Sequence, residues 1–473
     1  MTDPVLARLQ SDRTDIVARL RALVAAPSVS TDSAYRDGMA AARRILLSRL
    51  KESGFDNVGE LDAGGHPAVY ADWLGAPEAP TFLVYGHYDV QPPDPLDKWD
   101  SPPFEATERD GRLYGRGVSD DKGPSSIALE TLAAFLSVEK RLPANVRILL
   151  EGEEEMGSAT LPDLCRRFSD RLVADAVLSA DGARWRADLP SVNVGSRGNS
   201  GYEISLRTAA KDLHSGRFGG AVRNALHEMA ALLASLHDAD GRIAVAGYCD
   251  GVEDVGAEER SRVAAIPFDE AAFFEAIGSQ AHGEPGYSTL ERLWNRPTLE
   301  INGMWGGYTG EGAKTVTPAE AHAKLTTRLV TGQDPAAVGR ALEAHLRAHC
   351  PPGVDLTITE NHAGTAAYSV PPDHPLLLAA EGAIEATLGT APVRVRVGGT
   401  LPLSDIVRRT LGLDTVMLSF STADEDFHAP NEFFRLSAID EGLAAWVHLL
   451  RTLGTQSPED YAPFRHAPAG SER

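Results

Sequence analysis

The sequence has few cysteines, no long apolar run and a deficit of positive charge. Its three cysteines, Cys165, Cys249 and Cys350, form no CxxC pair, which argues against a disulfide framework and against a thiolate zinc site. No stretch approaches about 18 uncharged apolar residues, and the N-terminus lacks the apolar core of a signal peptide, so we expect no contact with a membrane. The net charge of −22, from 45 basic and 67 acidic residues, argues against a nucleic-acid partner. We therefore expect a cytoplasmic enzyme or binding protein.

Helices and strands alternate through the first part of the chain. Apolar periodicity predicts helices over residues 6–26 and 37–55 and a third from about Gly123. Apolar strands lie between and after them, and turns rich in glycine and acidic residues follow the strands. This order is typical of an α/β domain with a mostly parallel sheet.

The pattern changes near residues 195–201. Alternating strands and two helices then predict a compact α+β unit, after which helix, strand and helix return. We therefore expect an α/β domain formed by residues 1–196 and 364–473, split by an inserted α+β domain over residues 197–363. The Pro-rich tail after about Thr455 is expected to be loose.

Histidine, aspartate and glutamate side chains, which can bind metal ions, lie just after several predicted strands. Taken singly they have ordinary interpretations: a core histidine, a helix N-cap or a solvated run of glutamates. In an open α/β sheet, however, the carboxyl ends of the strands line one ligand crevice, so we expect these side chains to converge. They are His87, Asp89, Asp120, Asp121, Glu153, Glu154, Glu155, Asp181 and His428.

Two histidines with several carboxylates and no thiolate suit a catalytic metal site. Imidazole and carboxylate ligands favour Zn²⁺, with Mn²⁺ or Co²⁺ as alternatives. One carboxylate can bridge two such cations about 3.5–4 Å apart, and the cations lower the pKa of a shared water and polarise a carbonyl. A spare carboxylate beside them can act as general base. The sequence thus predicts two divalent metal ions per subunit and a hydrolase.

Six segments, in this order, resemble the signatures of the M20 metallopeptidase family, and most resemble its dipeptidase branch of carnosinase-like, cytosolic nonspecific dipeptidases. They read YGHYDVQP, LYGRGVSDDKG, LEGEEEMGS, LSADGARW, KDLHSGRFGG and FHAPNE, within residues 75–435. The resemblance implies that these residues hold two metals: His87 and Asp181 one, Glu155 and His428 the other, with Asp120 as the bridge. It also implies Glu154 as general base, Asp89 as the residue that orients His87, and a cis peptide between Asp120 and Asp121.

The run of three glutamates leaves one register open. The family pattern has two glutamates before x-Gly-Ser, and alignment on Gly157 and Ser158 selects Glu154 as base and Glu155 as ligand. Glu153 is then a bystander, and a shift of the roles by one residue remains the alternative.

The resemblance also implies residues that bind the substrate. His214 would come from the partner subunit of a homodimer, formed through the inserted domain, and stabilise the oxyanion. Arg328 would grip the C-terminal carboxylate of the substrate. Further pocket positions are Thr315, His362, Gly398, Gly399 and Thr400.

The function that follows is metal-dependent hydrolysis of the amide bond of small peptides, namely dipeptides with a free C-terminal carboxylate, by a metal-bridged water that Glu154 activates. The alternative within the family is an N-acyl amino acid deacylase of the acetylornithine or succinyl-diaminopimelate type. A nucleotide-binding oxidoreductase fits poorly, because Asp120 replaces the third glycine of GxGxxG in the segment GRGVSD. A binding protein without activity also fits poorly, because all the ligands and the base are present.

Overall fold

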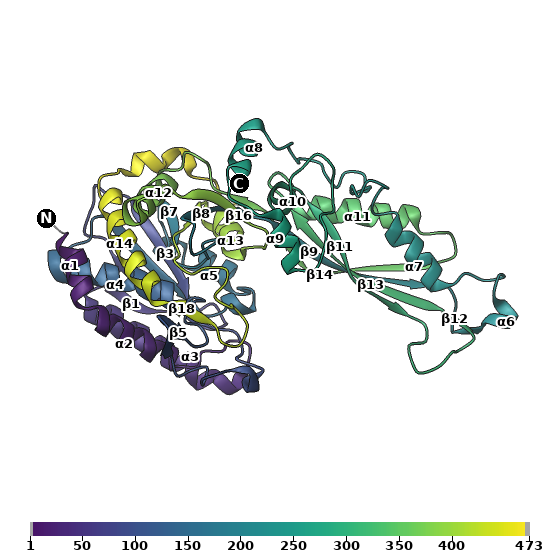
Figure 1. Ribbon diagram of the computed structural model, residues 1–473, viewed down its shortest axis with the longest axis horizontal. Coiled ribbons are helices and arrows are strands. Elements are labelled where there is room, and N and C mark those ends of the chain that lie inside the picture. The colour runs from purple at the N-terminus through teal and green to yellow at the C-terminus, as the bar shows by residue number, and fades with distance from the viewer. Residues whose placement is uncertain (1–2, 469–473) are drawn as a thin grey trace. The chain divides into compact units, whose positions relative to one another are not determined.

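The computed structural model describes residues 3–468, and for residues 361–363 it describes the backbone alone. The chain divides into two compact units, and Figure 1 labels many of their elements. The first unit comprises Met1–Val194, Val370–Val395 and Pro402–Arg473. The second comprises Gly195–Ser369 and the short segment Arg396–Leu401.

A six-stranded sheet forms the centre of the first unit. Its order is β1-β2-β6-β3-β7-β17, and the last four of these strands run parallel to one another, whereas β1 and β2 pair antiparallel at one edge. The predicted α/β class with a mostly parallel sheet is therefore confirmed. The strands are β1 (Asp56–Leu61), β2 (Ala68–Trp73), β3 (Thr81–His87), β6 (Asn145–Glu151), β7 (Ala176–Ser179) and β17 (Thr415–Met417).

Helices pack on this sheet around two sets of buried side chains. Helix α4 contacts β3 and is itself contacted by α1, α2, α3 and α14. A separate apolar cluster joins Leu83 and Tyr85 of β3 to Leu164 of α5 and Val407 of α13. The helices are α1 (Pro4–Ser11), α2 (Arg13–Val24), α3 (Arg36–Ser53), α4 (Lys122–Glu139), α5 (Leu161–Arg167), α12 (Pro375–Leu388), α13 (Pro402–Leu411) and α14 (Leu436–Leu453).

Strand β3 is buried on both faces, which explains its apolar sequence. Phe82, Leu83, Val84 and Tyr85 are each at most 1% exposed. A central strand of a parallel sheet is covered by helices on both sides and needs such residues. The strand thus holds His87, its last residue, in a rigid position.

Two features of the first unit differ from the sequence-based expectation. Residues 6–26 form two helices, because Asp12 ends α1 and begins α2 while its carboxylate binds Arg8. The described part of the tail, residues 456–468, contains a 3₁₀ helix, η5 (Pro458–Phe464), which buries Tyr461 against the ring of Phe82. The spacing of apolar residues predicts neither the break between two helices at Asp12 nor the burial of one aromatic side chain, Tyr461.

The second unit is built on a four-stranded antiparallel sheet of order β11-β13-β9-β14. Helices α7 and α11 contact these strands and share a buried apolar core with them. Its main elements are β9 (Gly198–Arg207), α7 (Ala225–Ala234), β11 (Thr298–Gly306), β13 (Glu320–Leu329), α11 (Pro335–His349) and β14 (Asp355–Thr365).

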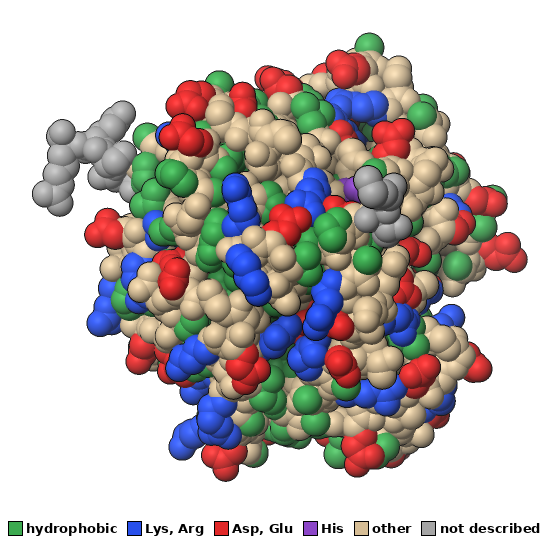
Figure 2. All heavy atoms as spheres, turned by 90° about the vertical axis from the view of Figure 1, so that its left-hand side faces the viewer, with side chains coloured by type: hydrophobic (Ala, Val, Ile, Leu, Met, Phe, Trp, Pro, Cys, Tyr) green, Lys and Arg blue, Asp and Glu red, His purple; other side chains and the backbone are tan. Residues whose placement is uncertain are grey.

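The surface agrees with the composition. Figure 2 shows basic and acidic side chains interspersed on the face that it draws. Such mixing offers no broad positive field for a polyanion. Among the helices within residues 3–468, none has both the length and the apolar character needed to cross a bilayer.

Candidate metal centre

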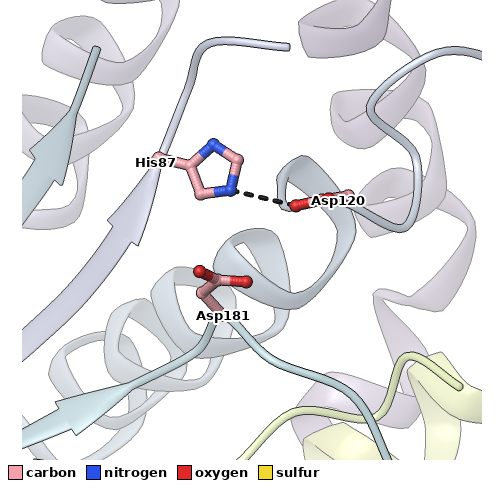
Figure 3. Close-up of side chains that lie close together, drawn as sticks. All are labelled: His87, Asp120 and Asp181. Carbon is pink, nitrogen blue, oxygen red and sulfur yellow. Dashed lines mark hydrogen bonds and ion pairs between the residues drawn. The ribbon is translucent and has the colours of Figure 1, made fainter. Parts of the chain in front are cut away.

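Asp120 lies between two histidines in the first unit. Its Oδ1 is 3.0 Å from Nε2 of His87, and its Oδ2 is 3.2 Å from Nε2 of His428. Figure 3 shows His87 at the end of β3, Asp120 in the loop before α4 and Asp181 after β7, with their side chains pointing toward one another. The two oxygens of one carboxylate therefore face two different imidazoles, as a bridging ligand requires.

Two groups of potential metal ligands share this carboxylate. One consists of His87, Asp120 and Asp181, and the other of Asp120, Glu155 and His428. Within each group the ligand atoms lie within 4.8 Å of one another. Both groups contain one imidazole and two carboxylates, a donor set that fits Zn²⁺, Mn²⁺ or Co²⁺.

Asp89 holds the other nitrogen of His87. Nδ1 of His87 is 3.1 Å from the carbonyl oxygen of Asp89 and 3.5 Å from its Oδ1. The hydroxyl of Ser30 and the backbone N–H of Glu155 both donate to Oδ2 of Asp89. With Nδ1–H donating to Asp89, the lone pair of His87 lies on Nε2, the nitrogen that faces Asp120.

The peptide between Asp120 and Asp121 is cis, as expected. The Asp121 carboxylate turns toward β3, where its Oδ2 accepts hydrogen bonds from the backbone N–H of His87 and the hydroxyl of Ser125. Asp121 thus ties the loop before α4 to the end of β3.

Glu153 points away from the cluster. Its Oε1 accepts a hydrogen bond of 2.9 Å from the backbone N–H of His66, and its Oε2 accepts one of 2.6 Å from the hydroxyl of Thr160. Its side chain lies so close to Gly65 that a Cβ there would be 1.9 Å from Oε1. Glu153 therefore anchors the glutamate turn to a neighbouring loop, a role that the sequence did not reveal.

The next two glutamates face the cluster. Oε2 of Glu155 is 3.1 Å from Nε2 of His428, and it accepts a hydrogen bond from the side-chain amide of Gln91. Glu154 is half-buried and interacts electrostatically with His87 and Asp181. Of the two, Glu155 belongs to a group of potential metal ligands and Glu154 does not.

The pKa values of these carboxyl groups are shifted in different directions: those of Asp181 and Glu154 are raised, and that of Asp120 is lowered. Burial raises the pKa of Asp181 to about 6, aided by the charge of Asp120, and raises that of Glu154 well above its usual range. Burial would also raise the pKa of Asp120, but hydrogen bonds with His428 and His87 lower it. Bound cations would stabilise the ionised form of all these carboxylates at once.

Glu432 supports the Asp120 loop and was not assigned from the sequence. It is fully buried, and its Oε1 accepts hydrogen bonds from the N–H groups of Ser119 (2.9 Å) and Asp120 (3.1 Å). Its Oε2 accepts from Gly117 N–H (2.9 Å) and from Nη1 of Arg116 (2.7 Å). One carboxylate thus holds the loop that carries the shared ligand.

Glu432→Gln is expected to weaken divalent-metal binding by about 10- to 100-fold, the usual effect of removing a partner that orients a metal ligand. The amide keeps the size of the carboxylate but replaces one accepting oxygen with a donor, which loses two of the four hydrogen bonds. Calorimetric titration of the metal-free protein with Zn²⁺ or Mn²⁺ measures the effect.

Glu130→Gln is the matched control. Glu130 is also buried and also accepts four hydrogen bonds, from Arg19 and Arg49, but it lies within α4. This variant should lose stability and keep its metal affinity. Equal metal affinities in the two variants would show that Glu432 has no special relation to the site.

The predicted substrate-binding residues belong to the second unit. His214 is exposed, and its Nδ1 accepts a hydrogen bond of 3.0 Å from Gly216 N–H, so a neutral ring carries its proton on Nε2. Nη1 of Arg328 donates to the hydroxyl of Thr400 at 3.0 Å.

The remaining pocket positions have less distinctive surroundings. Thr315 is exposed, and its carbonyl oxygen accepts a hydrogen bond from Ser215 N–H. The carbonyl oxygen of Gly399 accepts one from Arg197 N–H. The side chain of His362 lies outside the described part of the structure.

The chain belongs to the peptidase family M20/M25/M40, whose sequence pattern matches residues 83–452. The Beta-Ala-His dipeptidase of Homo sapiens is 32% identical over 378 residues, which cover 77% of this chain and 73% of that protein. The Cys-Gly metallodipeptidase dug1 of Schizosaccharomyces pombe is 28% identical over 472 residues, with 96% and 99% covered. The crystal structure of human carnosine dipeptidase 1 superposes with a TM-score of 0.76 at 28% identity, with 96% and 98% covered. The resemblance to the dipeptidase branch is thereby confirmed.

Proposed function

We propose that the chain is a metal-dependent dipeptidase that hydrolyses the amide bond of dipeptides with a free C-terminal carboxylate. The observation that carries the proposal is the position of Asp120, whose two oxygens face His87 and His428. The relatives described above are dipeptidases by name, which supports the choice of dipeptides.

Two divalent cations would be held in the two groups that share Asp120, His87 and Asp181 in one, Glu155 and His428 in the other. We take Zn²⁺ as the first candidate and Mn²⁺ or Co²⁺ as alternatives, because the ligands are imidazole and carboxylate. Bound there, such ions lower the pKa of water and polarise the scissile carbonyl.

The protein's own groups then move the proton. Glu154 takes a proton from the attacking water and passes it to the leaving amine. Its surroundings suit the second step, because burial favours the protonated acid that gives its proton to the amine. Asp89 keeps the His87 ring in the tautomer whose Nε2 faces the ligands.

Side chains of the second unit would bind the rest of the substrate. Arg328 presents a planar set of donors, which matches the C-terminal carboxylate. His214 carries its proton on Nε2 and can donate to the oxyanion that forms during attack. We propose that it acts on the partner subunit of a homodimer, with the inserted segment 197–363 as lid and dimerisation domain. Thr315, His362, Gly399 and Thr400 would line the same pocket.

A substrate panel tests the proposal. Protein loaded with Zn²⁺ or Mn²⁺ is given dipeptides, tripeptides and N-acyl amino acids, and kcat/KM is measured for each. Dipeptides should be turned over at least about tenfold faster than tripeptides. A group that binds the C-terminal carboxylate at a fixed distance from the hydrolysed bond leaves no room for a third residue. Faster turnover of N-acyl amino acids would instead establish the deacylase, which the dipeptidase relatives do not favour.

We place the protein in the cytoplasm, an assignment that the cysteines support. Cys165, Cys249 and Cys350 are all free, and reduced thiols are usual in that compartment.

A further inference from the structure

Arg197 immediately precedes β9, one of the two inner strands of the sheet in the second unit. Arg328 is on β13 and pairs in register with Asn199 of β9. Directly paired residues of neighbouring strands share a face of the sheet, so the side chain of Asn199, two residues after Arg197, lies on the same side as that of Arg328. The two guanidinium groups are close enough that Arg328 contributes to lowering the pKa of Arg197.

The short segment 397–399 surrounds Arg197. The backbone N–H of Arg197 is 3.3 Å from the carbonyl oxygen of Val397 and 3.1 Å from that of Gly399, and its Nε donates to the carbonyl oxygen of Gly398 at 2.9 Å. A Cβ at position 398 would lie 3.3 Å from Nη2 of Arg197, so a glycine there leaves room for the guanidinium. Thr400, which follows this segment, accepts the hydrogen bond from Arg328.

These contacts do not satisfy the guanidinium group of Arg197. The residue is only 9% exposed, and its Nη1 is buried without a hydrogen-bond partner among the described residues. Glu300, an exposed residue of β11, acts on it electrostatically but forms no ion pair with it. Burial, followed by the charge of Arg328, lowers the pKa of Arg197 to about 10.

A buried cation beside a second cation is costly in the absence of a counter-charge. If Arg197 only held the carbonyl oxygens of residues 397–399, its N–H donors would be sufficient. That role would not require a buried positive charge beside the charge of Arg328. A carboxylate is the anion whose planar pair of oxygens matches guanidinium donors. The pair Arg197 and Arg328 therefore has the charge and the donors of a carboxylate receptor.

We propose that Arg197 supplies a second guanidinium to the receptor for the substrate's C-terminal carboxylate, together with Arg328. This inference rests on the proposed function and extends it. Arg197 then sets specificity, because two cations favour a free carboxylate over an uncharged end more strongly than one does. The substrates are peptides whose last residue keeps its free acid.

The test compares a dipeptide with its C-terminal amide, which has the same shape and lacks the negative charge. The measured quantity is the ratio of the two kcat/KM values, called here the carboxylate preference. Where the amide is hydrolysed too slowly, its inhibition constant against the free dipeptide replaces its kcat/KM.

Arg197→Met is expected to lower the carboxylate preference by about 10- to 100-fold, the effect of losing one charge-assisted hydrogen-bonding group. The loss should appear in KM for the free dipeptide, with kcat and the values for the amide little changed. Arg197→Lys keeps a charge and should retain most of the preference. If Arg197→Met does not fold, Arg197→Gln gives the uncharged comparison.

Arg296→Met is the matched control within the same unit. Arg296 is also largely buried, but it is paired with Glu284, so its loss should affect stability and leave the preference unchanged. An unaltered preference in the uncharged Arg197 variants, with both substrates slowed equally, overturns the inference and makes Arg197 a support for the 397–399 segment. Failure of the wild-type protein to hydrolyse any dipeptide would instead count against the proposed function, and it is seen before any variant is made.

Discussion

Glu154→Gln is expected to lower kcat for a dipeptide by about 10²- to 10⁴-fold or more, the contribution typical of a general acid–base group. The amide has the size of the carboxylate but cannot take up the proton of the attacking water. Glu154 is absent from both groups of candidate ligands, so metal affinity should stay near that of the wild type. Steady-state kinetics and calorimetric metal titration on the same preparation measure the two effects separately.

Glu153→Gln is the control for this experiment. Glu153 is the preceding residue of the same turn, but its carboxylate is bound to His66 and Thr160. This substitution should lower the thermal midpoint of unfolding and change kcat by less than about threefold. The opposite result, with turnover lost and metal affinity kept in the Glu153 variant but metal affinity lost in the Glu154 variant, would shift the roles by one residue.

The Glu154 variant also tests the action of His214 across a homodimer. A mixture of Glu154→Gln and His214→Ala chains forms heterodimers in which one of the two sites has both an intact base and an intact histidine. Activity should then rise well above that of either variant alone. Stable heterodimers that remain inactive would show that His214 does not act on the partner subunit.

Asp120→Asn is expected to abolish turnover and to weaken binding at both metal positions by at least about 100-fold. One carboxylate serves both positions, so its loss removes a negative ligand from each. Metal content after dialysis and calorimetric titration measure stoichiometry and affinity directly, without reference to activity.

Two further substitutions distinguish a ligand that serves both metal positions from a ligand that serves only one. Asp181→Asn and Glu155→Gln each alter a residue that belongs to one group, so each should weaken the first or the second ion and leave about one equivalent bound. If Asp120→Asn still binds two equivalents with wild-type affinity, Asp120 is not the bridge. If Asp181→Asn loses both ions, the two positions are not distinct.

The sequence predicted the residues of the cluster because strand order and residue type carry that information. His87 ends β3, and Asp181 follows β7, its direct neighbour in the parallel sheet. The carboxyl ends of neighbouring parallel strands meet at one edge, so side chains that follow them are brought together by the fold itself. The helix predicted over residues 37–55 corresponds to α3, whose end has a similarly local cause, since Gly54 follows it with a left-handed φ of 88°.

Contacts between distant segments could not be predicted in this way. Glu432 reaches the N–H groups of the Asp120 loop across more than 300 residues, and Arg197 binds the 397–399 segment across about 200. Periodicity describes the chain within a few turns of a residue and gives no distance between such segments. Glu432 is the last residue of the FHAPNE segment, and Arg197 lies in residues 195–201, where the pattern of predicted elements changes. The role of each buried charge becomes clear only when its neighbours in the fold are known.

The contact between Glu432 and the Asp120 loop has a consequence for the order of events during synthesis. The ribosome makes His87, Asp120, Glu155 and Asp181 long before it makes His428 and Glu432. Until then the Asp120 loop lacks its carboxylate support and one of its two imidazoles. A nascent chain that has not yet reached residue 428 therefore lacks a ligand of one candidate metal group, and hydrolytic competence is expected only after residues 428–432 have been made.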